Sequence, residues 1–491
     1  MAQLPVELLR QIVKEVRNGP PCGNEDCTRA SQSNDSDGSV RPGQGRCVHL
    51  TKYEGLLGGK TVSLTPVRNV IFSFEEYGEY VERLPMDDER NMPDDIMDDF
   101  MRVAHSSAYD WTDEEMSRLI SGYVDAEATL LLQLLPNVVS LDLDFPTWDL
   151  TENESHQEQG IFRHDLLRKY LNQTHEEISD GESFLASLER FYMPNPYQAA
   201  FTLKSAYPPC WYWDITELPG VFSFPHLKSL SLERCASSGD KTLYIVGKRG
   251  GIGKLEELSI TEAALEACDL DWILTLPNAL KSFKYAVPRL DELFEDCITS
   301  PRLVFEHLTK QKHSLERLEL STISKGDIFE QFLHFDDRAE FADWDWEAND
   351  DEEGHTAKLY RLFQPLDLHD FKVLKSISLH VLDLLGVDFW LKPGAHGKRL
   401  VDVLPSSLET LILSHECDLD IPKYYSRYGP GNFPYYDHMT GLLDCKTQRF
   451  GRLRRVVLSF EHEWPDCVLV EHAAEVGVEL EIRRFRKRRD R

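Results

Sequence analysis

A short pattern of apolar residues recurs nine times along the chain, at the first, fourth and sixth positions of a short segment. The intervals between successive copies range from 25 to 59 residues. The nine copies are Val138, Leu141 and Leu143; Leu188, Phe191 and Met193; Leu227, Leu230 and Leu232; Leu255, Leu258 and Ile260; Leu280, Phe283 and Tyr285; Leu315, Leu318 and Leu320; Leu374, Ile377 and Leu379; Leu408, Leu411 and Leu413; and Leu453, Val456 and Leu458.

Each copy is predicted to form a β-strand. Because strand side chains alternate, the fourth and sixth positions point to one side, while the third, fifth and seventh point to the other. The first set is apolar throughout, and the second set is mostly polar, as in Ser229, Ser231 and Glu233. The pattern therefore predicts strands with an apolar back and a polar front.

Helices are expected between the strands. Pro136, Pro277 and Pro405 each lie two or three residues before the first position of a copy, where a proline ends a preceding helix. The sequence Thr112-x-x-Glu115 has the form of a capping box, and we expect it to open the helix that ends near Leu135. Alternating helices and strands predict an α/β fold with parallel strands.

This arrangement resembles the leucine-rich-repeat family, in which each repeat buries its apolar side only against its neighbours. The resemblance covers about Val124 to Phe485. The asparagine that regular repeats carry after the third leucine is absent, and most intervals exceed the usual length of about 20 to 29 residues. The resemblance implies an irregular leucine-rich-repeat solenoid.

The N-terminus carries a predicted amphipathic helix with Pro5 in its first turn. The stretch is similar to the first helix of an F-box, the adaptor-binding module of Skp-cullin-F-box ubiquitin ligases, and fungal proteins that join an F-box to degenerate leucine-rich repeats are the family that the whole chain resembles. The alternative is a plain helix that caps the first repeat. The residues that match the F-box, and that would face the Skp adaptor, are Leu4, Pro5, Glu7, Leu8, Leu9 and Ile12.

Five segments follow from these patterns. Residues 19–60 include a stretch rich in Gly, Ser, Asn and Pro, which is typical of a flexible linker. Residues 336–356 are strongly acidic and are expected to form a solvated insertion. The segments are an F-box-like helix at 1–18, the linker at 19–60, an N-terminal capping region at 61–123, the degenerate repeat solenoid at 124–485 and a basic tail at 486–491.

Composition narrows the classes of partner. The chain has 84 acidic against 54 basic residues and a net charge of -30, which argues against nucleic-acid binding and favours a basic client. Ten scattered cysteines are typical of a reducing compartment, and no signal peptide or membrane span is found. We therefore expect a cytoplasmic or nuclear protein. The basic tail suits nuclear import or pairing with acidic loops of the same chain.

Client binding is expected on the polar front of the strands and on two aromatic loops that interrupt the repeat, since Tyr and Trp are enriched at binding hot spots. The alternative for the loops is that they cover exposed repeat core. The candidate client-binding residues are Ser231, Ser259, Glu319 and Ser378 on the strands, and Trp211, Trp213, Tyr424, Tyr428 and Tyr435 in the loops.

No motif predicts catalysis, because the common hydrolase and metalloprotease patterns are absent, and we expect no enzyme and no cofactor. Gly58-Gly-Lys-Thr61 lacks the glycine that a phosphate-binding loop needs at position 54. Whether zinc binds stays open, because Cys22, Cys27, Cys47 and His49 give four ligands with unusual spacing. We expect a non-enzymatic substrate receptor of a ubiquitin ligase, or else a repeat scaffold with no ligase link.

Overall fold

The structure is a computed structural model of the 491-residue chain. It describes residues 47–51, 69–73, 98, 101–105, 111–120, 124–135, 137–144, 165–177, 185–193, 213–237, 253–263, 265–287, 301–321, 365–386, 398–415, 434–460 and 467–484. The chain divides into two compact units, Met1–Glu233 and Arg234–Arg491. The division falls within the segment 124–485 that was expected to form the solenoid.

The first unit is built on a sheet in the order β1-β2-β3-β4-β6. β1 pairs antiparallel with β2, and the following pairs are all parallel. The described elements of this unit are β1 (Cys47–Thr51), β2 (Asn69–Ser73), α3 (Asp113–Ile120), α4 (Val124–Gln133), β3 (Ser140–Asp144), α6 (Asp165–Glu177), β4 (Arg190–Met193), β5 (Trp213–Asp214), the 3-10 turns η5 (Ile215–Glu217) and η6 (Pro219–Ser223), and β6 (Ser229–Glu233).

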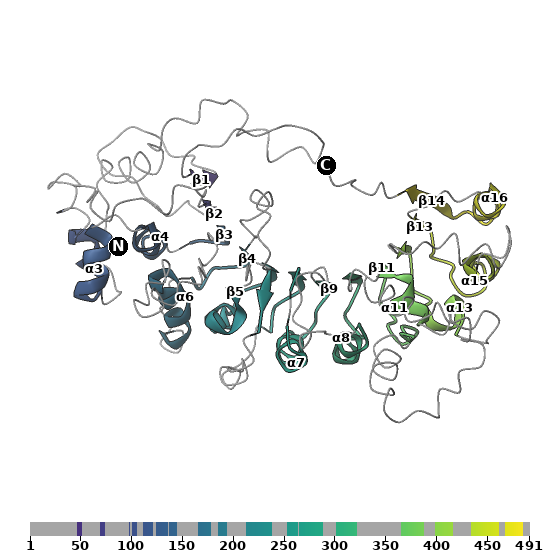
Figure 1. The fold of residues 1–491 in the computed structure, drawn as a ribbon, viewed down its shortest axis with the longest axis horizontal. Helices are drawn as coiled ribbons and strands as arrows, with labels where there is room; N and C mark the ends of the chain where they lie inside the picture. The colour runs from purple at the N-terminus through teal and green to yellow at the C-terminus, as the bar shows by residue number, and fades with distance from the viewer. Residues whose placement is uncertain are drawn as a thin grey trace, which may run out of the picture. The chain divides into compact units, whose positions relative to one another are not determined.

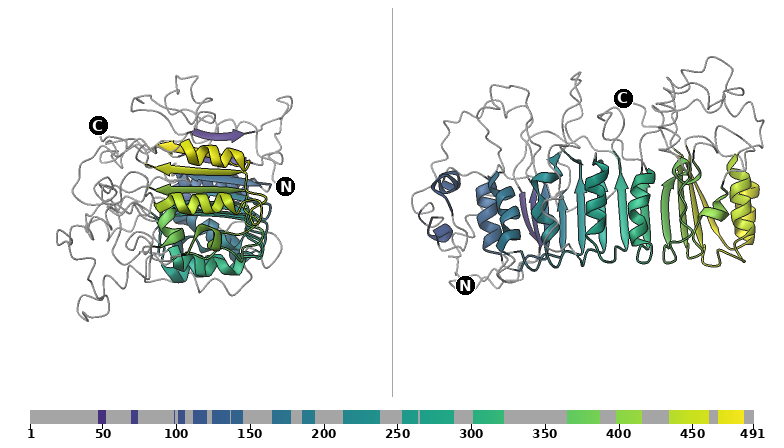
Figure 2. Two further views of the ribbon diagram at one scale, coloured as in Figure 1. Left: turned by 90° about the vertical axis from the view of Figure 1, so that its right-hand side faces the viewer. Right: turned by 90° about the horizontal axis from the view of Figure 1, so that it is seen from below.

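The second unit has a parallel sheet in the order β8-β9-β10-β11-β12-β13-β14. Its helices lie on one side of the strands, as Figures 1 and 2 show. The described elements are β7 (Cys235–Ala236), β8 (Glu257–Thr261), α7 (Ala267–Thr275), β9 (Ser282–Ala286), α8 (Pro301–Leu308), η11 (Thr309–Gln311), β10 (Arg317–Ser321), β11 (Ser376–His380), α11 (Val381–Leu385), α13 (Leu400–Val403), β12 (Thr410–His415), α15 (Pro434–Asp444), β13 (Arg455–Phe460), α16 (Cys467–Glu475) and β14 (Glu479–Arg484).

All nine segments predicted from the apolar spacing form strands: β3, β4, β6 and β8 to β13. The eighteen side chains at their fourth and sixth positions are 0 to 3% exposed. Burial of a large aliphatic side chain stabilises a fold by about 1.5–3 kcal/mol, so these two columns supply much of the core. The predicted α/β class with parallel strands is confirmed.

Three helices end close to the prolines that were expected to stop them. α4 ends three residues before Pro136, α7 ends two residues before Pro277, and α13 ends two residues before Pro405. Since each proline cannot donate the next helical hydrogen bond, the chain leaves the helix there. The following strands begin a few residues later.

The capping box was predicted correctly, but the extent of its helix was wrong. The Glu115 amide donates to Thr112 Oγ1 at 3.2 Å, and the Thr112 amide donates to Glu115 Oε2 at 2.8 Å. The capped helix is α3, which ends at Ile120, and a separate helix, α4, runs on toward Leu135. Gly122 lies between the two in the sequence, and glycine disfavours a continuous helix by about 1 kcal/mol relative to alanine.

In the interval between β4 and β6, the described residues form short turns. These are the 3-10 turns η5 and η6. Gly220 in η6 packs closely on α6, where a Cβ atom would lie 2.4 Å from the Leu171 carbonyl oxygen. The Gly220 amide donates to the Asn172 side chain at 3.1 Å, so a short turn forms this contact.

Buried polar side chains join the turn of one repeat to the next. Gln311 donates from Nε2 to the carbonyl oxygens of Leu274 and Pro277 at 3.2 and 2.9 Å, and its Oε1 accepts from the Leu280 amide at 3.1 Å. Ser407 donates to the Leu374 carbonyl oxygen at 2.8 Å in the same way. These bonds satisfy backbone groups that would otherwise be buried without partners.

The second position of every repeat after the first carries a charge, and the signs alternate along the chain. We call this row the charge ladder. The backbone aligns the row, because the Lys281 amide donates to the Glu256 carbonyl oxygen and the Glu316 amide to that of Lys281, both at 2.8 Å. In the first unit the ladder is Glu189 and Lys228; in the second it is Glu256, Lys281, Glu316, Lys375, Glu409 and Arg454.

Ion pairs join neighbours in the ladder. The Nζ atoms of Lys228, Lys281 and Lys375 lie 2.6 to 2.8 Å from the carboxylates of Glu189, Glu256 and Glu316, respectively. The hydrogen bond from Lys375 lowers the pKa of Glu316 below its usual value, and the bond to Glu256 raises the pKa of Lys281. Because cross-strand pairs of opposite charge stabilise and like pairs destabilise, the alternation favours this register of strands.

No helix within the described ranges is long and apolar enough to cross a membrane.

Lys281→Glu is expected to lower the thermal midpoint of the full chain more than Lys281→Gln does, because it puts a third carboxylate between Glu256 and Glu316. The difference between the two variants should shrink in about 1 M salt, where the Debye length is about 3 Å. Circular dichroism melts at two ionic strengths measure it. Lys372→Glu, an exposed lysine outside the ladder, is the control; equal losses for both glutamate variants would contradict a role of the ladder.

Candidate functional site

The polar front predicted from the sequence is formed by the third, fifth and seventh residues of the strands, and in the second unit it makes one continuous surface that we call the front face. The strand register places these residues in three rows. Along β8 to β14 they are Glu257, Ser259 and Thr261; Ser282, Lys284 and Ala286; Arg317, Glu319 and Ser321; Ser376, Ser378 and His380; Thr410, Ile412 and Ser414; Arg455, Val457 and Ser459; and Glu479, Glu481 and Arg483.

Three of the candidate client-binding residues come together in the fifth-position row of the front face. Ser259 pairs with Lys284, Lys284 with Glu319, and Glu319 with Ser378 in successive strands. Neighbouring strands lie about 4.8 Å apart, so these four side chains form one short line. The sequence separates Ser259 from Ser378 by more than a hundred residues.

Ion pairs order the charged side chains of this face. Lys284 Nζ lies 2.8 Å from Glu319 Oε1 on the adjacent strand. The Arg317 guanidinium reaches over the intervening Ser282 and lies 2.8 Å from Glu257 Oε1. Both pairs are exposed to solvent, so each is worth about 1 kcal/mol or less, and their main effect is to fix which side chains a partner meets.

The front face of the second unit carries no net charge. Its acidic residues number four, Glu257, Glu319, Glu479 and Glu481, and its basic residues also number four, Lys284, Arg317, Arg455 and Arg483. The overall charge of -30 therefore resides elsewhere in the chain. A basic client would gain no net attraction from this face, which offers hydroxyl groups and balanced charge pairs instead.

The side chains of the front face differ in solvent exposure from strand to strand. Arg317 and Glu319 on β10 are exposed, and Ser259 and Lys284 are half-buried. In contrast, Val457 and Ser459 on β13 are only 1% and 4% exposed, and His380 at the end of β11 is 5% exposed. A partner can therefore reach the front face more readily over β8, β9 and β10 than over β13.

The first unit also has a polar front on its strands. Ser231 lies at the fifth position of β6 and is half-buried. On the same face, the Tyr192 hydroxyl of β4 donates to Glu233 Oε1 at 3.1 Å. Ser231 thus lies beside an ordered pair of polar side chains, as its strand position predicted.

The remaining predicted site residues are only partly covered by the structure. Trp213 begins β5, and Tyr435 lies in α15. Cys47 and His49 lie on β1. The residues outside the described ranges are Trp211, Tyr424, Tyr428, the two other proposed zinc ligands Cys22 and Cys27, the acidic insertion 336–356, and the adaptor-binding set Leu4, Pro5, Glu7, Leu8, Leu9 and Ile12.

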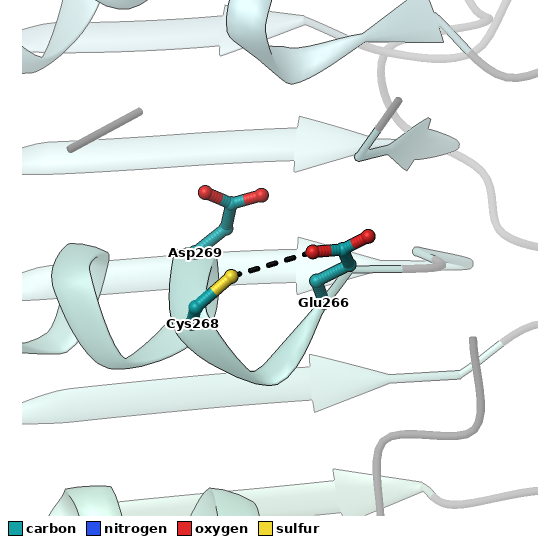
Figure 3. A group of neighbouring side chains, drawn as sticks. All are labelled: Glu266, Cys268 and Asp269. Atoms are coloured by element: carbon teal, nitrogen blue, oxygen red, sulfur yellow. Dashed lines mark hydrogen bonds between the residues drawn. The ribbon is translucent and has the colours of Figure 1, made fainter. Parts of the chain in front are cut away.

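A cluster that the sequence did not single out lies at the start of α7, where Glu266, Cys268 and Asp269 bring ligand atoms within 4.8 Å of one another (Figure 3). Cys268 Sγ donates to Glu266 Oε2 at 3.4 Å. Partial loss of hydration and this bond raise the pKa of the Cys268 thiol above its usual value. The thiol is therefore protonated at neutral pH, and it is not an activated nucleophile.

The same cluster is a poor match for a metal site. Its three donors come from four consecutive residues, and among the described residues no fourth donor joins them. A helix N-terminus carries a partial positive charge, which favours the carboxylates themselves but opposes a bound cation. The arrangement is that of carboxylates stabilised by a helix terminus.

Two features of this unit were missed in the sequence. Arg234 and Glu262 have left-handed backbone φ angles of 50° and 51°, which cost a non-glycine residue about 1 kcal/mol or more, and they form an ion pair with each other. No local motif marks these positions. The charge ladder, in contrast, could have been found by reading the second position of each copy in order.

Comparison with models of protein families finds no match for this chain, and comparison with curated proteins finds none either. The resemblance to F-box and leucine-rich-repeat proteins therefore stays a prediction from the sequence.

Glu266→Gln is expected to increase the rate at which iodoacetamide alkylates Cys268 at pH 8, because it removes the bond and the negative charge that raise the pKa of the thiol. In the wild type, the alkylation rate should keep rising above pH 9, which is the usual pKa of a thiol, because the pKa of Cys268 is higher. Peptide mass spectrometry follows the labelling of this cysteine. Glu306→Gln, an exposed carboxylate on α8, should leave the rate unchanged, and equal rates in all three proteins would refute the assignment.

Proposed function

We propose that this chain is a non-enzymatic interaction protein with an irregular leucine-rich-repeat solenoid, and that it serves as the substrate receptor of a Skp-cullin-F-box ubiquitin ligase. The client binds the front face of the strands. The N-terminal helix binds the Skp adaptor and thereby brings the client to the cullin ligase.

The observation that carries the client-binding part is the continuous row of Ser259, Lys284, Glu319 and Ser378. Such a row presents side chains from four strands on a rigid backbone, with one ion pair within the row and a second, Arg317 with Glu257, beside it. Rigid presentation lowers the entropy lost when a partner binds. The balanced charge favours recognition through hydrogen bonds and shape, with weak dependence on salt.

The adaptor-binding part rests on the resemblance of Leu4, Pro5, Glu7, Leu8, Leu9 and Ile12 to the opening of an F-box. An amphipathic helix of this kind binds through apolar side chains one and two turns apart, which enter a groove on the partner. The second candidate function is a repeat scaffold in which this helix only caps the first repeat. The scaffold function is favoured by the length of the repeat region, because a long row of strands can bind a partner without a ligase.

The two candidates differ in one measurable property. Purified Skp adaptor should be retained by the immobilised wild-type chain and lost from a Leu8→Asp, Ile12→Asp double variant, because charges would enter an apolar groove. An Arg10→Asp variant, changed on the opposite side of the predicted helix, should still retain the adaptor. If the wild type does not retain the adaptor, the chain is not a ligase receptor, and the scaffold function is the candidate that remains.

Client binding can be tested separately. A Ser259→Arg, Ser378→Arg double variant is expected to weaken binding of a client retained by the wild type by about tenfold, equivalent to about 1.4 kcal/mol, because two long cations would occupy the row. Thr309→Arg, which changes an exposed hydroxyl residue on the helical side, is the matched control. Unchanged affinity of the double variant, measured by titration calorimetry, would exclude the front face as the client site.

A further inference from the structure

Among the residues that the structure describes, β14 pairs with another strand on one side only, and we call its other side the open edge. β14 bonds to β13 on one side, and it stands at the end of the strand order among the described residues. The Glu479 amide donates to the Arg454 carbonyl oxygen at 2.8 Å, so the backbone groups of Glu479 face β13. In a parallel ladder these directions alternate, which leaves the amides and carbonyls of Leu480, Ile482 and Arg484 at the open edge. Such an edge is a template for another strand.

Burial at this end of the unit differs from burial in the other strands. Leu480 and Ile482 occupy the fourth and sixth positions of β14 but are only half-buried, whereas the equivalent side chains of the nine predicted strands are at most 3% exposed. On the adjoining helix α16, Val468 and Val470 are 52% and 40% exposed. Repeat arrays need a polar surface at their ends to stay soluble. This end combines the charges of β14 with exposed and half-buried apolar side chains.

The charges along β14 are divided between its two halves. Glu479 and Glu481 lie in the first half, and Arg483 and Arg484 in the second. A second β14 in antiparallel orientation, centred on Ile482, would put each Glu481 opposite the Arg483 of the other copy and the two Ile482 side chains opposite each other. Opposite charges at directly paired positions stabilise antiparallel strands.

Other registers of two identical strands are disfavoured. A parallel arrangement in register would put like charges opposite each other, and antiparallel centres on Glu481 or Arg483 would pair that residue with itself. The centre on Ile482 also agrees with the backbone, because it pairs Ile482 with Ile482 and Leu480 with Arg484, the residues whose amides and carbonyls face the open edge. Charge and backbone therefore select the same register.

We propose that the open edge of β14 binds a second copy of this chain, by antiparallel pairing about Ile482. The two sheets then continue into one another across a twofold axis. Helix α16 lies beside β14 at this end of the unit (Figure 1). Val468 and Val470 lie about 200° apart around this helix, so one of them from each copy can turn toward the half-buried Leu480 and Ile482. The pairing buries apolar side chains that the single chain leaves partly exposed.

Electrostatics near the axis support the charge pairing. Glu481 accepts hydrogen bonds from Arg483 Nε at 2.7 Å and from the Arg455 guanidinium at 2.5 Å. These bonds lower the pKa of Glu481 to about 2, so the carboxylate is charged at neutral pH. In the pairing, Glu481 keeps these bonds within its own chain and also lies opposite the Arg483 of the second copy.

A charge-exchange experiment tests the proposal on the full chain. The wild type should have a mass near twice the 56.6 kDa of one chain in light scattering after gel filtration. Glu481→Arg alone should be monomeric, since it puts arginine opposite arginine, and Arg483→Glu alone should be monomeric for the converse reason. An equimolar mixture of the two variants should recover the dimer, because each opposed pair is then arginine with glutamate. Glu306→Arg, at an exposed position on α8, should remain dimeric.

Mixing leaves every contact within each chain unchanged, so recovery reports pairing between chains alone. A Val468→Asp, Val470→Asp variant, changed only at exposed positions, should also be monomeric and covers the case in which an edge variant does not fold, as judged by circular dichroism. A wild type that is monomeric at every concentration, edge variants that dimerise like the wild type, or a mixture that stays monomeric would each overturn the proposal. None of these results depends on whether the Skp adaptor binds.

Discussion

Burial of the fourth and sixth residues of each strand is the interaction on which the structure depends. The strands of the sheet and the helices that pack on it bury these residues together. Stacking in turn aligns equivalent positions of successive repeats through the backbone hydrogen bonds. The front face, the charge ladder and the buried Gln311 and Ser407 all follow from that alignment, because each needs neighbouring repeats in a fixed register.

The same alignment separates two kinds of polar residue. In the charge ladder, each lysine that pairs has its partner in the residue just before a neighbouring strand, which serves the register of the sheet. On the front face, hydroxyl groups and two ion pairs are presented to solvent over β8 to β10. Register and recognition are therefore encoded at different positions of one short repeat, and a change at the fifth position can alter binding with little effect on stacking.

Much of the fold could be predicted because apolar and polar residues alternate with a period of two in the strands, and the buried apolar positions can be recognised directly in the sequence. β2 has the same spacing in Val67, Val70 and Phe72 and could have been found, whereas β14 has Gly477 at the first position and so lacks one of the three apolar residues. The front-face residues were predicted from alternation alone. Their ion pairs were not, because pairing depends on which strands become neighbours across intervals of very different length, such as the one between β10 and β11. The burial of Val457 and Ser459 has no local sequence signal.

The alternating sign of the charge ladder limits how the length of this protein can change. Loss or duplication of one strand and helix would bring two glutamates or two lysines onto adjacent strands, whereas loss or duplication of two in succession would preserve the order of signs from Glu256 to Arg454. For a designer who wishes to shorten or extend the array, the smallest interchangeable module is therefore a pair of repeats with one acidic and one basic member.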